Sequence, residues 1–141
     1  MKNILTYEEF LNESKLTERF DDKMKPILSI GSTNLITGKS KYWNFYEEWA
    51  KSDDDMTCEI YTDVTKLAPG EVSEKKPNKF VFTSGKKPIG DIQPGERRSF
   101  KDDQRGRPLF TGEFVGYALI KDLKSYASKL GIKSGTGYVY K

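Results

Sequence analysis

The chain has 141 residues, a length that suits one ordinary domain with its own core and is too short for two. Its formal net charge of +3 permits attraction to nucleic acid without requiring it, and a content of 13% aromatic residues excludes a disordered chain. Because it has no histidine and a single cysteine, Cys58, we exclude imidazole catalysis, histidine-ligated zinc and an intramolecular disulfide.

The first predicted element is a short amphipathic helix in residues 1–13. Thr6 suits the N-cap position and Glu9 is its capping-box partner. Three apolar side chains share one face: Tyr7, Phe10 and Leu11. A helix this short does not persist alone in water, so we expect this face to dock on a partner surface. The alternative is that it packs on the chain's own domain. Residues 14–25 are polar and predict a tether.

Residues 26–141 are predicted to form a single small α+β domain with an antiparallel sheet and two helices, because strand and helix patterns are mixed without βαβ regularity. Strands are expected at 27–30, 57–64, 79–83, 109–120 and 137–141, the fourth as a hairpin or a bulged strand. The helices are expected at 42–50 and 119–130, the second ending at Gly131. Residues 91–108 are predicted to be rich in loops, with only short strands possible.

A glycine-lysine-serine sequence, Gly38 to Ser40, is similar to the end of a phosphate-binding loop. That motif needs a glycine where Thr33 stands, and Gly31 is two residues too early. An ordinary polar loop is therefore the favoured interpretation.

Two further sites carry residue types that serve in metal binding or in nucleophilic catalysis. Ser52 to Asp55 offers three carboxylates but lacks the spacing and glycine of a calcium loop, so we expect a solvated helix end and no metal. Cys58 lies within an expected strand and has no neighbouring base, which predicts a small core residue. We therefore expect neither a cofactor nor an enzymatic activity.

A basic patch is the candidate nucleic-acid-binding site. The sequence Arg105 to Pro108 resembles the core of an AT-hook, in which Arg-Gly-Arg lies in a narrow minor groove. Arg97 and Arg98 would join Arg105 and Arg107 if the two segments meet. The alternative is a basic turn that leads into a strand.

The opening sequence "MKNILTYEEFLNE" resembles the capsid-targeting peptide of internal head proteins of T-even-type bacteriophages. That peptide has the form Met-Lys, a spacer, Thr-Tyr-x-Glu-Phe-(Ile/Leu)-x-Glu and a small residue, here Ser14; the spacer is longer in this chain. The resemblance implies that residues 1–13 carry the chain into the prohead, where a phage protease cuts after glutamate in Leu/Ile-x-Glu. It covers about a tenth of the chain and implies nothing about the fold of the rest.

The pattern that this protease would cut occurs at two places near the N-terminus. Leu11 with Glu13, before Ser14, forms the first, and Leu16 with Glu18 forms the second. In an extended chain, residues two apart point the same way, so each pair suits two neighbouring pockets of a protease. Cleavage after Glu13 also removes more acidic than basic side chains. The product would be better suited to a DNA-filled capsid.

The sequence thus predicts a bacteriophage protein packaged inside the virion head and processed there, with no membrane partner because no apolar stretch approaches membrane-spanning length. The expected partners are the prohead scaffold and the maturation protease. The domain would be injected into the host cytoplasm to inhibit a host defence enzyme. The alternatives are a DNA-binding phage protein that uses the arginine patch and an uncleaved structural component of the virion. A third alternative, an enzyme that works through arginine and carboxylates, has no motif in the sequence.

Overall fold

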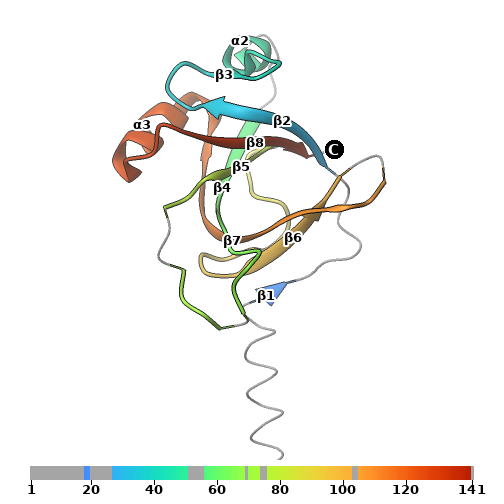
Figure 1. The fold of residues 1–141 in the computed structure, drawn as a ribbon. Helices are drawn as coiled ribbons and strands as arrows, with labels where there is room; N and C mark the ends of the chain where they lie inside the picture. Colours follow the sequence, from blue (N-terminus) through green and yellow to red (C-terminus); the bar gives the residue numbers. More distant parts are fainter. Residues whose placement is uncertain are drawn as a thin grey trace, which may run out of the picture.

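The computed structural model describes residues 18–19, 27–50, 56–68, 70–73, 76–102 and 105–140. The strands are β1 (Glu18–Arg19), β2 (Ile27–Asn34), β3 (Lys39–Ser40), β4 (Met56–Asp63), β5 (Lys79–Ser84), β6 (Arg97–Lys101), β7 (Pro108–Leu119) and β8 (Ser134–Tyr140). Within these ranges the helices are α2 (Phe45–Ala50) and α3 (Ile120–Leu130), which lie outside the sheet (Figure 1). The predicted α+β class is confirmed.

The sheet is mixed rather than antiparallel, which corrects the prediction for its topology. Its strand order is β1-β6-β7-β4-β5-β8-β2-β3. Most neighbouring strands are antiparallel, but β5 and β8 are parallel, and so are β1 and β6. The chain leaves β7, passes through α3 and returns as β8 between β5 and β2. This crossover connection fixes the direction of β8, so local alternation in the sequence does not reveal it.

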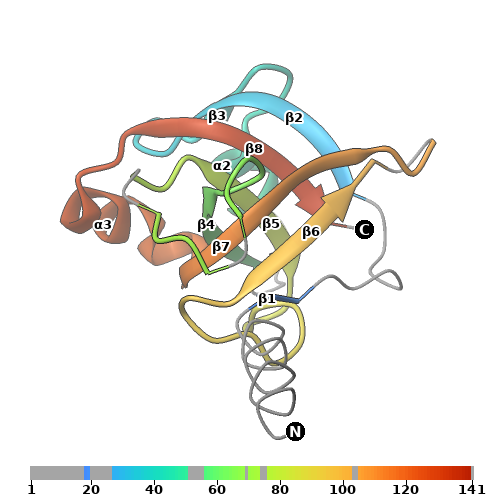
Figure 2. The ribbon, with the colours of Figure 1, turned by 60° about the horizontal axis from the view of Figure 1, so that its bottom comes forward.

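The sheet is so strongly curved that its first and last long strands, β6 and β2, lie next to each other. Ile27 at the start of β2 forms a parallel bridge with Asp102, which directly follows β6 (Figure 2). β2 in turn pairs with β8 along its whole length, from Ile27 opposite Tyr140 to Asn34 opposite Ser134. A register shift between β4 and β7 shows that β7 is a bulged strand, as one of the two predictions for it stated. The result is a small barrel.

Alternate residues of the central strands face two different hydrophobic clusters. Cys58 and Ile60 of β4 belong to the first cluster, which includes Leu123 and Ala127 of α3 and Phe45 of α2. The second cluster is mainly aromatic and has these members from β4, β6, β7 and β8: Tyr61, Phe100, Phe110, Phe114 and Tyr138. Both faces of β4 are therefore covered, and Cys58 is a buried core residue as predicted.

Several local predictions need correction, while the C-terminal helix agrees closely. β2 continues to Asn34, four residues beyond the expected end, and β6 is a short strand within the segment predicted to be rich in loops with only short strands possible. α3 ends at Gly131, which adopts the left-handed conformation with φ of 72°, as predicted. Gly38 has φ of 76° and a Cβ there would overlap the ring of Tyr46, so this glycine serves the turn between β2 and β3. Residues 52–55 lie outside the described ranges.

Candidate functional site

The predicted patch of four arginines does not form, because Arg97 and Arg98 are buried. Each side chain is 4% exposed. The guanidinium of Arg97 donates hydrogen bonds to the backbone oxygens of Ala68, at 3.0 Å, and Glu71. Arg98 donates to the backbone oxygen of Ile89. Both arginines therefore hold loops against β6 and present no charge to an external phosphate.

Arg105 and Arg107 are exposed on the turn between β6 and β7. Asp102 organises this turn: its carboxylate accepts from the backbone N–H of Arg105 at 2.8 Å and pairs with Nε of Arg107 at 3.3 Å. The backbone hydrogen bond from Arg105 is the main cause that lowers the pKa of Asp102 below its ordinary value. The turn is thus a locally ordered basic turn before a strand, which is the alternative that the sequence left open.

The predicted docking and cleavage residues fall mostly outside the described ranges. This holds for Tyr7, Phe10 and Leu11, and also for Glu13, Ser14 and Leu16. Glu18 is described in its backbone only: it begins β1, where Glu18 and Arg19 pair with Arg97 and Arg98 of β6. The second candidate cleavage bond therefore lies within a strand pair, inside the segment predicted as a tether.

A buried polar group that sequence reasoning missed lies inside the barrel. Glu59, Tyr61 and Arg98, called here the Glu59 cluster, are each less than 5% exposed. The hydroxyl of Tyr61 donates to Oε1 of Glu59 at 2.6 Å, and the backbone N–H of Ile89 donates to Oε2. The backbone oxygen of Ile89 also accepts the hydrogen bond from Arg98. The N–H and the oxygen of this one residue therefore both attach the 85–94 loop to the cluster. The cluster thus closes this part of the barrel and is not open to a substrate.

Burial dominates the electrostatics of this cluster. It raises the pKa of Glu59 above its ordinary value, and the hydrogen bonds from Tyr61 and Ile89 and the charge of Arg98 offset only part of that effect. Burial also raises the pKa of Tyr61 and of the neighbouring Cys58 thiol well above the usual values. Tyr61 and Cys58 therefore remain protonated at neutral pH, so neither supplies an activated nucleophile.

The raised pKa of Glu59 predicts a specific dependence of stability on pH. In the unfolded chain Glu59 loses its proton at a lower pH than in the fold, so its contribution to stability is present at acid pH and declines as pH rises. We expect Glu59→Gln to remove this decline, so that the variant gains in free energy of unfolding relative to the natural chain as pH rises from about 4 to about 7. Urea denaturation at several pH values measures it. A constant difference across this range would contradict the assignment.

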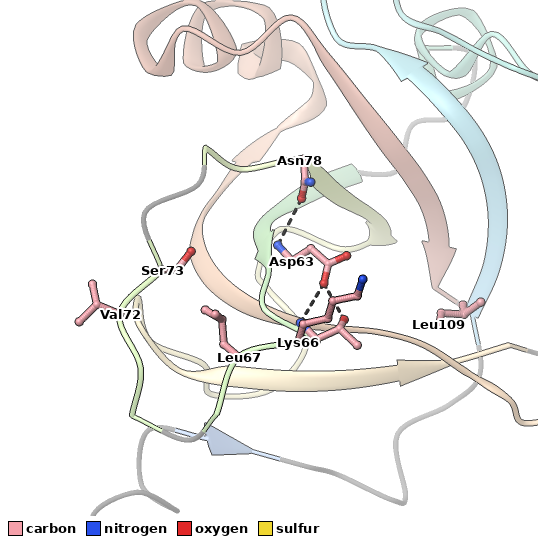
Figure 3. A pocket seen from close by; sticks show the side chains of 8 residues that line it. Asp63, Lys66, Leu67, Val72, Ser73, Asn78 and Leu109 are labelled. Carbon is pink, nitrogen blue, oxygen red and sulfur yellow. Dashed lines mark hydrogen bonds between the residues drawn. The ribbon is translucent and has the colours of Figure 1, made fainter.

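An open cavity of about 630 Å³ lies at one end of the barrel. It is bounded by the end of β4, the start of β5 and β7, and the 64–73 segment, and is called here the mouth cavity (Figure 3). Its lining includes three polar side chains, Asp63, Lys66 and Asn78, and three apolar ones, Leu67, Val72 and Leu109. Cavities of this size that combine an apolar wall with a few polar groups are the usual place for small ligands, and barrel mouths are a frequent location.

Asp63 holds the wall of the mouth cavity in place. Its Oδ1 accepts from both the backbone N–H, at 2.9 Å, and the hydroxyl of Thr65, and its Oδ2 lies 3.6 Å from the Lys79 ammonium. Partial burial acts to raise the pKa of Asp63, but the hydrogen bonds from Thr65 and the charge of Lys79 outweigh it and lower the pKa. Asp63 is therefore ionised at neutral pH, and its charge is already neutralised within the fold.

No family model, curated protein or solved structure matches this chain. Among the described residues, the acidic and cysteine side chains form no group suited to hold a metal ion. No helix within the described ranges is long and apolar enough to cross a membrane.

Proposed function

We propose that this chain is a bacteriophage internal head protein, carried into the prohead by residues 1–13 and cleaved there, and that its barrel acts as a binding module for a host defence enzyme. The opening sequence supports the first part of this proposal, since Thr6, Tyr7, Glu9 and Phe10 match the targeting peptide.

The observation that carries the proposal is the position in the chain of β2, the first long strand of the barrel. Ile27, fully buried, is the first residue of β2, and its bridge to Asp102 closes the sheet. Among the residues that the structure describes, the members of both hydrophobic clusters all lie from Ile27 onward. A chain cut after Glu13 would therefore keep every described residue of these clusters, which supports a detachable targeting segment.

Packaging and processing can be tested by producing the tagged chain in cells infected with a T-even-type phage. We expect the protein inside purified, nuclease-treated virions, with Ser14 as its new N-terminus by mass spectrometry. We expect less cleavage after Glu18, because the Glu18–Arg19 bond lies in β1 and a protease needs an unpaired extended strand.

Two variants make this experiment specific. Phe10→Asp places a charge on the docking face and should abolish packaging, whereas Glu13→Gln should allow packaging but prevent the cut that makes Ser14 the N-terminus. Asn3→Asp introduces the same charge in the spacer, outside the docking face, and is the matched control. Absence of the natural chain from virions, or equal packaging of Phe10→Asp, would refute the proposal.

A further inference from the structure

The mouth cavity has donors that the fold does not use. Lys66 and Asn78 both line it, and Asn78 uses its side-chain oxygen to accept from the backbone N–H of Asp63 at 3.2 Å. Within the described part of the chain, neither the Lys66 ammonium nor the Asn78 amide nitrogen has a hydrogen-bond partner. Figure 3 shows these two side chains on either side of Asp63. Because Lys79 and Thr65 already satisfy Asp63, the charge left to attract a ligand in this group is positive.

An apolar surface lies within the same cavity. Leu67 and Leu109 are partly exposed, and Val72 is 83% exposed, an unusual state for an apolar side chain that lines a hollow. Figure 3 shows Leu67 and Val72 on the segment that faces the polar group, with Leu109 on the opposite side. A ligand that fills this space would cover these side chains and gain hydrophobic free energy.

We propose that the mouth cavity binds a small organic carboxylate, with its apolar body against Leu67, Val72 and Leu109. Lys66 and Asn78 donate to the carboxylate oxygens. A charge-assisted hydrogen bond together with an apolar contact gives both affinity and orientation. The volume of about 630 Å³ accommodates an acid that carries one aromatic ring. This site is independent of the packaging function proposed above, because it involves only residues of the barrel and its loops.

The test compares three probes of the same shape on the full chain: 4-phenylbutyrate, 4-phenylbutanol and 4-phenylbutylamine. We expect calorimetry to show the carboxylate binding most tightly and the amine least. Amide resonances of residues 63–67, 72 and 78 should shift in ¹H–¹⁵N spectra. Equal affinity for the three probes, or shifts scattered elsewhere on the surface, would overturn the proposal.

Variants at exposed positions separate binding from folding. Lys66→Gln should weaken 4-phenylbutyrate binding by about three- to fivefold, the usual effect of one exposed charge, and leave 4-phenylbutanol unaffected. Lys121→Gln removes an exposed lysine of α3 and is the control. Val72→Asp should abolish binding, since it replaces an apolar contact with a repelling charge, while the thermal midpoint stays unchanged. If Lys66→Gln and Lys121→Gln have the same affinity, the assignment of Lys66 fails.

Discussion

Replacing Arg98 by methionine is expected to lower the free energy of unfolding at pH 7 by about 3 kcal/mol. The substitution keeps most of the side-chain volume but removes the positive charge beside the buried Glu59 carboxyl. It also leaves the backbone oxygen of Ile89 without its donor, so the 85–94 loop loses one of its two attachments to the cluster. Urea denaturation followed by tryptophan fluorescence measures the change.

A double-mutant cycle identifies the cause of this loss. If the effect of Arg98 arises from its charge beside Glu59, Arg98→Met should cost at least about 1 kcal/mol less in the Glu59→Gln background. Arg107→Met is the matched control, because Arg107 is exposed on the turn after β6, and its effect should stay within about 0.5 kcal/mol. Equal losses of free energy of unfolding at positions 98 and 107 would show that the buried charge of Arg98 does not stabilise the fold.

Phe110→Ala is expected to cost about 3–5 kcal/mol, because it leaves a cavity in the aromatic cluster. Phe110 is 2% exposed, and its ring stacks on those of Phe100 and Tyr138, with centroids 5.0 Å away in each case. These three rings come from β6, β7 and β8, so one side chain links strands on both sides of the barrel. Thermal and urea denaturation test the effect.

A graded series keeps this prediction testable if Phe110→Ala fails to fold. Phe110→Leu fills part of the space and should show a smaller loss in the same direction. Leu130→Ala is the control: this residue is 37% exposed at the end of α3, and its truncation should matter far less. A loss at position 110 no larger than at position 130 would contradict the assigned role of the aromatic cluster.

The elements that the sequence predicts well are those whose pattern is local. Alternating or continuous runs of apolar residues predict β4 and β5. Apolar residues three to four positions apart, followed by Gly131, predict α3. β6 is predicted only as a possible short strand in a loop-rich segment, because Arg97 and Arg98 occupy buried strand positions where a sequence pattern is expected to show apolar residues. Their burial depends on carbonyl acceptors in distant loops, which no local pattern contains.

The candidate sites depend even more on long-range arrangement. Glu59 offered one signal, a charged residue inside a strand pattern, but its partner Arg98 comes from β6, which the sequence offered only as a possible short strand. The mouth cavity brings together the ends of β4, β5 and β7, and its apolar wall includes Val72, which lies outside every strand and helix expected from the sequence. The parallel pairing of β5 with β8 likewise joins segments far apart in the chain, so only the assembled barrel reveals these neighbours.

The pairing of Ile27 with Tyr140 places the two ends of the barrel side by side. A short linker between these ends could therefore make a circular permutant without stretching the sheet, with new termini opened at an exposed turn such as the one around Gly85. For the same reason, a fluorescent domain fused after position 140 would emerge next to residue 27. At that position the fluorescent domain would hinder docking of the N-terminal segment on its partner. A fluorescent reporter used to follow packaging should therefore be inserted in an exposed loop instead.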